Sequence, residues 1–354
     1  MNKISLLLIA CVTFFTAGSC EKGGDEDNPG KATKNLPGTI YWYFGGNVGY
    51  QEFKGGKYVG EKMPMGVGSS RFDSFDISWD NQNILLSMDA EGTFNFDERR
   101  FVLRKNSDGI KYADLADNSN LFDIVYEWED ISTTNAFISP NGKYLALAAQ
   151  HFSDLPVTII DVEAEDAVSS WSMRGVSFLQ YGSPVWTADN TVYFRIANDI
   201  FKSSLADGFQ TAPHVLTLPS GSSYATVNPQ GSKIVYRNNK HLWICNMDGS
   251  DPKQITTCKT LDIIDNDGEK SPVFSPDGKY IAFTGATSSG TPWSDHNYPD
   301  GSWVAATGGN YGYIVIIPAD GNLYDLDNLN SGAIWLKESG GNNGIACSHR
   351  IVWR

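Results

Sequence analysis

The stretch FSPDGKYIAF, residues 274–283, decides the fold of this chain, because it places a complete hairpin turn between two apolar runs. Proline presets the backbone for the second position of a tight turn, aspartate can bond its own backbone, and glycine adopts the positive φ that closes a hairpin. We therefore interpret Asp277 and Gly278 as turn residues and not as part of a catalytic loop. Lys279 is expected on the exposed side of the strand that follows.

The same pattern of apolar strand, polar turn and alternating strand occurs in four other places. The copies are FDISWDNQNILLSM (75–88), AFISPNGKYLALAA (136–149), PVWTADNTVYFRI (184–196) and ATVNPQGSKIVYRN (225–238). Further strands that end in an acidic-Gly turn follow them, most clearly in HLWICNMDGSDPKQIT (241–256). Turns that recur at about 40 to 49 residues are typical of propeller blades, each of which is a four-stranded sheet.

This string of SPDGKYIAF units and Asp-Gly turns resembles the TolB-like propeller repeat over nearly all of residues 39–354. The resemblance implies an all-β, six-bladed β-propeller of four-stranded blades. The segment 39–61 supplies strands without a leading one, and GIACSHRIVWR (344–354) is a lone strand at the other end. Because free strand edges invite aggregation, we expect the C-terminal strand to join the first blade. We expect no counterpart of the N-terminal α/β domain of TolB itself, and therefore no role in the Tol machinery.

The N-terminus has the pattern of a lipoprotein signal. Lys3 precedes an apolar run at 4–15, which is too short to span a membrane and is typical of a signal peptide. The following AGSC (17–20) resembles the lipobox of bacterial lipoproteins, in which the cysteine is acylated and becomes the new N-terminus. We predict a signal peptide at 1–19 and lipidation of Cys20, palmitate included, with roughly 0.8 kcal/mol of membrane binding per buried methylene. The alternative is an ordinary secretory signal.

A polar segment without apolar period separates Cys20 from the repeats. We interpret residues 20–38 as a flexible tether and residues 39–354 as the β-propeller domain. Lys22 and the acidic residues at 25–27 resemble the export signal of cell-surface lipoproteins of the Bacteroidetes. The resemblance implies a lipid-anchored outer-membrane protein displayed on the cell surface, and the periplasmic leaflet of the outer membrane is the alternative.

Charge and motif content exclude several classes of function. The chain has 354 residues, of which 41 are acidic and 27 basic, giving a formal net charge of −14. Such a chain repels phosphate backbones, so nucleic acid is not expected as a partner. Its five histidines lack the paired spacing of a zinc site, and no GxSxG nucleophile elbow occurs. We expect a monomer with no metal, no cofactor and no catalytic residue.

Candidate binding residues lie in loops that depart from the repeat. The longest is the insertion at 285–312, and the loops AAQHFSDLP (148–156) and GSSRFDSFD (68–76) are expected on the same face. Long loops are usually functional or mobile, and exposed rings beside Asp and His suit a sugar ring or a peptide side chain. Alternatively, the tryptophans fill a gap under their own loop. The predicted ligand-binding residues are Trp293, Asp295, His296, Tyr298, Trp303, His151, Phe152 and Arg71.

The pattern therefore favours a protein that binds a glycan, a peptide or an outer-membrane protein partner, and two other classes stay open. One is a structural subunit of an outer-membrane complex. The other is a glycoside hydrolase or polysaccharide lyase, which needs two suitably spaced carboxylates at the channel mouth. The candidate acids are Asp73, Asp76, Asp154, Asp262, Asp265 and Glu269.

Two further features have plain structural interpretations. Cys245 lies in the middle of a predicted strand and is expected to be a buried apolar residue. A disulfide between Cys258 and Cys347 is possible, because both lie in or near loops. The acidic run at 261–272 lacks the full pattern of a calcium loop, and we interpret it as a solvated loop.

Overall fold

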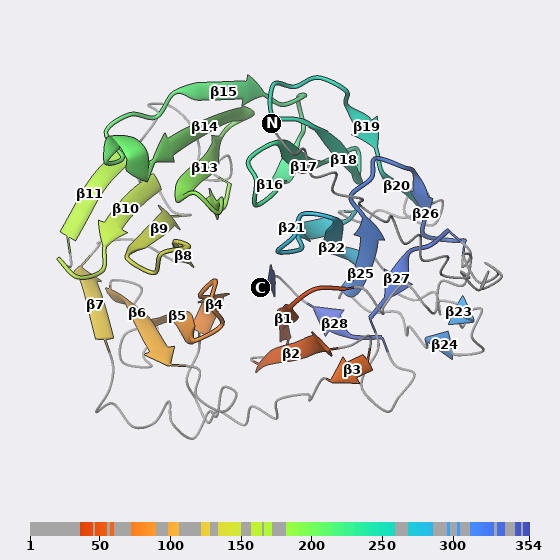
Figure 1. Ribbon diagram of the computed structural model, residues 1–354, viewed down its shortest axis with the longest axis horizontal. Helices are drawn as coiled ribbons and strands as arrows, with labels where there is room; N and C mark the ends of the chain where they lie inside the picture. Colours follow the sequence, from red (N-terminus) through yellow and green to blue (C-terminus); the bar gives the residue numbers. More distant parts are fainter. Residues whose placement is uncertain are drawn as a thin grey trace, which may run out of the picture.

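The computed structural model forms a ring of sheets (Figure 1), with the C-terminus near its middle. It describes residues 36–44, 47–54, 57–59, 72–89, 98–105, 122–127, 134–149, 157–164, 166–171, 182–258, 268–285, 296–297, 303–304, 312–328, 331–336, 344–347 and 350–354. Within these ranges, five sheets have four strands and one has five. The predicted all-β propeller is confirmed, and we call these sheets blades one to six.

Blades one to three occupy the lower and left parts of the ring in Figure 1. In order from the innermost strand outward, blade one is β29 (Ile351–Trp353), β1 (Thr39–Phe44), β2 (Asn47–Lys54) and β3 (Lys57–Val59). In the same order, blade two is β4 (Phe72–Ile77), β5 (Asn83–Asp89), β6 (Glu98–Lys105) and β7 (Phe122–Glu127). Blade three is β8 (Thr134–Ile138), β9 (Tyr144–Ala149), β10 (Val157–Asp161) and β11 (Asp166–Trp171).

Blades four to six complete the ring, and short strands join or extend them. Blade four is β12 (Val185–Trp186), β13 (Thr191–Ile196), β14 (Asp199–Ser204) and β15 (His214–Thr217), with the 3-10 helix η6 (Leu205–Asp207). Blade five is β16 (Ser223–Val227), β17 (Lys233–Asn238), β18 (His241–Asn246) and β19 (Lys253–Gln254). Blade six is β21 (Lys270–Phe274), β22 (Tyr280–Gly285), β25 (Gly312–Pro318) and β27 (Ile334–Trp335), and β28 (Ala346–Cys347) also pairs with β25. Two small pairs are β20 (Thr256–Thr257) with β26 (Tyr324–Asp325), and β23 (His296–Asn297) with β24 (Trp303–Val304).

The C-terminal strand closes the ring, as predicted. Strand β29 pairs antiparallel with β1, so that Ile40 lies opposite Trp353. At the end of this pairing the Arg354 N–H donates to the Thr39 carbonyl at 2.9 Å. The Trp353 indole N–H donates to the Pro37 carbonyl at 2.7 Å, and Leu36 is buried in the same core, so the packed region begins slightly before the predicted domain start.

The turn at 275–278 has the chemistry that the sequence predicts. The Ser275 hydroxyl donates to Asp277 Oδ1 at 2.6 Å, and the Tyr280 N–H donates to the Ser275 oxygen at 2.9 Å. Gly278 has a φ of 72°, which a residue with a side chain rarely adopts. The Lys279 side chain is 76% exposed. The stretch is therefore a structural turn, confirmed in every part.

Equivalent turns in neighbouring blades contact one another along one face of the ring. The Asn141 N–H of blade three donates to Asn190 Oδ1 of blade four at 3.0 Å. The Ala188 N–H of blade four donates to the Pro229 carbonyl of blade five at 2.9 Å. We call this face the turn face. These bonds explain why polar turn residues recur in the repeat, since they both close a hairpin and join two blades.

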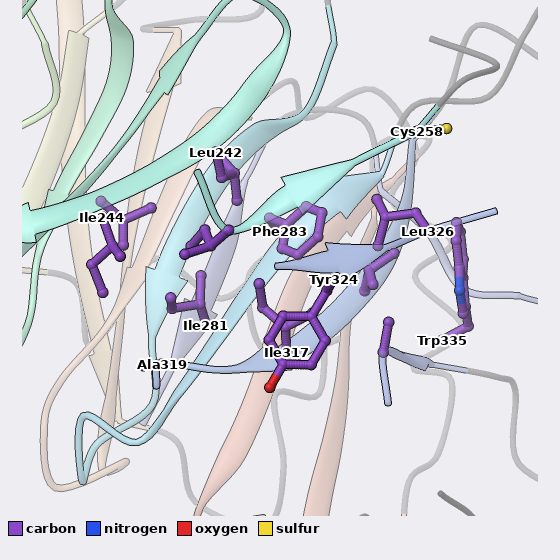
Figure 2. Packing of buried hydrophobic residues seen from close by; sticks show 14 of the residues in the cluster. Leu242, Ile244, Cys258, Ile281, Phe283, Ile317, Ala319, Tyr324, Leu326 and Trp335 are labelled. Carbon is purple, nitrogen blue, oxygen red and sulfur yellow. The ribbon is translucent and has the colours of Figure 1, made fainter. Parts of the chain in front are cut away.

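Apolar side chains fill the space between blades, as Figure 2 shows for the cluster between blades five and six. Leu242 and Ile244 of β18 meet Phe283 of β22 and Ile317 of β25, and all four are at most 4% exposed. The parallel pair β20 and β26 joins the same two blades at their outer side. Alternating strand residues thus pack against the next blade on each side, which is the pattern that the apolar alternation predicts.

An ionic cluster fastens the closing strand to the blades beside it. Asp76 of β4 is fully buried; its Oδ1 lies 3.1 Å from Arg354 Nη2 and 3.4 Å from Arg350 Nη2, and its Oδ2 accepts the Ile138 N–H at 2.8 Å. The Arg350 guanidinium carbon also lies 3.9 Å from the centre of the Phe137 ring. Burial lowers the pKa of Arg350 to about 10, and the Asp76 carboxylate counteracts this shift. One carboxylate therefore joins blades one, two and three.

Asp76→Asn removes the charge that compensates both arginines. We expect the free energy of unfolding to fall by about 3 kcal/mol or more, because two largely buried guanidinium groups lose the charge of the Asp76 carboxylate. Urea denaturation followed by fluorescence measures this change. The control is Asp251→Asn, whose side chain is 60% exposed in its ion pair with Lys253 and for which a loss of at most about 1 kcal/mol is expected. Equal stability of the two variants would contradict the role of the cluster.

The three described cysteines are buried, and no disulfide links any two of them. The disulfide considered between Cys258 and Cys347 is absent: Cys258 Sγ donates to Asp327 Oδ1 at 3.3 Å, and Cys347 Sγ donates to the Arg350 carbonyl at 3.3 Å. Cys245 is 5% exposed, as predicted, and burial raises the pKa of its thiol to about 11.

Cys245 is expected to resist alkylation in the native protein. With a thiol pKa of about 11, only about one in a thousand molecules carries the thiolate at pH 8, and the sulfur is enclosed as well. Iodoacetamide labelling followed by peptide mass spectrometry should leave Cys245, Cys258 and Cys347 unmodified without denaturant and modify all three in urea. Rapid labelling of native Cys245, or a peptide pair linked by a disulfide, would contradict this description.

Candidate functional site

A second face of the ring lies opposite the turn face. In each blade the second strand ends and the third strand begins at this edge of the sheet. We call it the loop face. It includes the two-residue turns at 197–198 and 239–240, the linker at 218–222, and in blade six the end of β22 at Gly285 and the start of β25 at Gly312.

Most of the predicted binding residues lie outside the described part of the chain. This holds for Trp293, Asp295, Tyr298, His151, Phe152 and Arg71. For His296 and Trp303 the backbone alone is described, in the hairpin of β23 and β24, where His296 lies opposite Val304 and Asn297 opposite Trp303. The blade-six insertion thus contains a short antiparallel pair of strands, and its role in binding stays a prediction.

Two of the candidate acids are engaged in structural bonds. Asp76 holds the closing strand through its two arginines. Glu269 is fully buried: its Oε2 accepts the Leu242 N–H at 2.8 Å and the Thr256 hydroxyl at 2.5 Å, and its Oε1 lies 3.3 Å from His241 Nδ1. Because both oxygens of each carboxylate already have partners, neither acid is placed to act on a substrate at the channel mouth.

The side chains of the other four candidate acids are not described. Asp154, Asp262 and Asp265 lie outside the described residues, and Asp73 is described only by its backbone in β4. Among the described residues, no group of three His, Cys, Asp or Glu side chains is placed to bind a metal ion. No helix in the described ranges has the length and apolar character needed to cross a membrane.

A buried cation lies on the loop face between blades four and five. Arg195 of β13 is 9% exposed, and its Nη1 donates to the Ala197 carbonyl at 2.7 Å and to the Ser222 carbonyl at 3.2 Å. Its Nε is enclosed without a hydrogen-bond partner. Burial lowers the pKa of Arg195, and no carboxylate among the described residues opposes the shift. Burying a charged group without a counter-charge is costly, so this position needs an explanation beyond packing.

The strand that follows the linker at 218–222 carries an exposed aromatic ring. Tyr224 is 40% exposed and has a φ of 49°, a left-handed conformation that is unusual for a bulky residue. It lies in a β-bulge, since Ser223 pairs with Arg237 and Thr226 with Val235. The Arg237 guanidinium carbon lies 4.6 Å from the centre of the Tyr224 ring, and its Nε donates to the Ser223 hydroxyl at 2.9 Å. Bulges re-aim side chains and are frequent next to functional sites.

The bulge occurs in another blade as well, whereas the exposed ring is described only in blade five. Blade six has the same irregularity between Lys270 and Val273, and Ser271 there has a φ of 51°. Among the described residues, only blade five combines such a bulge with an exposed large aromatic residue. Blades five and six therefore share the bulge, and blade five differs in placing the exposed Tyr224 ring there.

Sequence reasoning missed Arg195 and Arg237, although a signal was present. Both residues are next to last in the second strand of their blades, in TVYFRI (191–196) and KIVYRN (233–238). An arginine at the same place in two aligned copies departs from the apolar alternation of the repeat. No sequence pattern marks Tyr224 as exposed, because that depends on the bulge.

The comparisons with known proteins concern the fold. No protein-family model and no curated protein matches the chain. The solved structure of TolB from Acinetobacter baumannii is similar, with a TM-score of 0.50 at 16% identity over 82% of this chain and 64% of that chain. A chain assigned as TolB from Agrobacterium tumefaciens gives a TM-score of 0.44 at 15% identity over 80% of this chain and 85% of that chain. The chain thus has a TolB-like β-propeller fold and spans less than two thirds of the first of these proteins.

If Arg195 serves binding and not stability, then an apolar residue of similar shape should be tolerated. We expect Arg195→Met to unfold with a free energy equal to or above that of the wild type, because it removes a buried cation for which the described residues supply no carboxylate. Urea denaturation provides the measurement. A loss of about 3 kcal/mol or more would show that the guanidinium is a structural support.

Proposed function

We propose that this protein is a lipid-anchored binding protein whose propeller presents its loop face to a glycan, a peptide or a partner protein. The observation that carries the proposal is the contrast between its charged groups. Asp76 forms ion pairs with Arg350 and Arg354, and both oxygens of Glu269 accept hydrogen bonds. Among the described residues, Arg195 has no carboxylate partner and its enclosed Nε has no hydrogen-bond partner. Its partner Ser222 precedes the exposed Tyr224 by two residues on the loop face. Propeller scaffolds hold such loops rigidly, which lowers the entropy lost on binding.

The proposed location rests on the N-terminal sequence. Cys20 in AGSC would carry the acyl chains, and the acidic residues at 25–27 after Lys22 would direct the protein to the cell surface. A tether at 20–38 would let the propeller face away from the membrane.

Mass spectrometry of the mature protein tests the anchor. We expect an acylated N-terminal Cys20, and we expect Cys20→Ala to release the protein from the membrane fraction, because the acyl chains supply the membrane binding. Protease treatment of whole cells then separates surface display from the periplasmic leaflet. An unmodified, soluble wild-type protein would contradict the anchor.

Removing the two tryptophans of the insertion tests the loop face. We expect Trp293→Ala with Trp303→Ala to weaken binding at least about tenfold on glycan arrays or in pull-downs from native membranes, since aromatic anchors dominate such interfaces. The matched control is Leu323→Ala, which removes a 58% exposed apolar side chain at the turn-face side of blade six, where the Ala319 N–H bonds to the Lys279 carbonyl. Unchanged binding in the tryptophan variant, or turnover of a polysaccharide in place of binding, would count against the proposal.

A further inference from the structure

The segment 220–224 joins the two arginines of the loop face into one site. Its Ser222 carbonyl accepts from Arg195 Nη1 at 3.2 Å, and its Ser223 hydroxyl accepts from Arg237 Nε at 2.9 Å. Asn238 Nδ2 donates to the Ser220 carbonyl at 3.0 Å, which fixes the start of the segment. Blade four therefore contributes one guanidinium and blade five the other, with Tyr224 at the exposed end.

Only one nitrogen of the Arg195 guanidinium donates hydrogen bonds to described residues. Its Nη1 makes two hydrogen bonds and its Nε makes none, and no described residue accepts a hydrogen bond from its Nη2. Arg195 is 9% exposed, and no carboxylate among the described residues compensates its charge. The preceding linker at 172–181 contains no acidic residue in its sequence that would serve as a counter-ion. A carboxylate from outside the chain would complete the site, since the planar guanidinium fork matches carboxylate oxygens.

We propose that Arg195, Arg237 and Tyr224 form a site for an acidic sugar, in which the guanidinium of Arg195 binds the carboxylate and the ring of Tyr224 contacts the sugar face. This inference rests on the proposed binding function and names its ligand class. The chemistry favours a glycan over an acidic peptide. Arginine clusters also bind acidic peptides, but this site adds one exposed ring together with serine, asparagine and backbone groups, which suit the face and the hydroxyls of a sugar.

The overall charge of the chain makes such a site selective. With a formal net charge of −14, most of the surface repels anions. Binding of an acidic glycan then depends on the local cations, and it should weaken as salt is added. It should also require the free carboxylate, because an ester keeps the sugar ring but removes the charge.

The test uses the full chain and defined polysaccharides. De-esterified homogalacturonan and alginate supply uronate carboxylates, and fully methyl-esterified homogalacturonan is the matched uncharged probe. We expect calorimetry or biolayer interferometry to detect binding of at least one uronate polymer and at least about tenfold weaker binding of the ester. Arg195→Met should reduce the affinity at least about tenfold, as expected for the loss of a charge-assisted pair. The affinity of Arg195→Lys should lie between those of the wild type and of Arg195→Met, because lysine keeps the charge but lacks the planar fork of the guanidinium.

Two further variants keep the outcome decisive. Tyr224→Asn removes the ring while keeping a residue that tolerates positive φ, and it should weaken binding without loss of stability. Lys279→Met removes a cation that is 76% exposed on the turn face and should leave the affinity unchanged. Equal affinity of wild type and Arg195→Met, tighter binding of a poly-glutamate peptide than of every uronate polymer, or no binding of any uronate polymer would each overturn the inference.

Different experimental results would contradict the acidic-sugar site and the proposed binding function. If Arg195→Met keeps the affinity for an uncharged glycan or a captured protein that the tryptophan variant loses, the acidic-sugar site is wrong and the binding function stands. If glycan arrays and native-membrane pull-downs both return nothing, then the binding function itself is wrong.

Discussion

The closing of the ring by β29 is the constraint on which the rest of the structure depends. A propeller has no free ends only if the last strand pairs with the first, and in this chain that strand is short: Ile351–Trp353. Pairing alone gives few hydrogen bonds, so the strand is also held by side chains. Asp76 of blade two bonds Arg350 and Arg354 at its flanks, and the Trp353 ring lies in the core between blades one and six. The buried Asp76 carboxylate thus holds the closing strand in place.

The buried charged groups of the structure differ in the partners that they have. Where the fold buries a charge for its own use, it supplies a partner, as Asp76 does for two arginines and the Leu242 N–H does for Glu269. Arg195, which is 9% exposed, differs from these groups: among the described residues it has no carboxylate partner, and its enclosed Nε has no hydrogen-bond partner. Since an uncompensated cation costs stability, its presence on the loop face is best explained by a ligand that supplies the missing charge.

The architecture was predictable because turn chemistry and strand alternation are local. The turn at 275–278, the copies at 136–149 and 225–238, and the lone C-terminal strand were sufficient to predict a closed propeller. The site was not predictable in the same way. Arg195 and Tyr224 acquire their meaning from contacts between blades, and the Tyr224 ring is exposed by a bulge that no residue pattern marks. Asp76 and Glu269 are candidate catalytic acids in the sequence, but in the fold both are buried and hydrogen-bonded.

Hydrogen exchange of the full chain, measured with and without a de-esterified uronate polymer, tests the central claim most directly. The account predicts slower exchange at 195–199 and 220–224, where blades four and five meet on the loop face, and unchanged exchange in the turns at 139–142 and 275–278 on the opposite face. Slower exchange confined to the turn face, or an unchanged pattern at a polymer concentration that saturates binding, would contradict it.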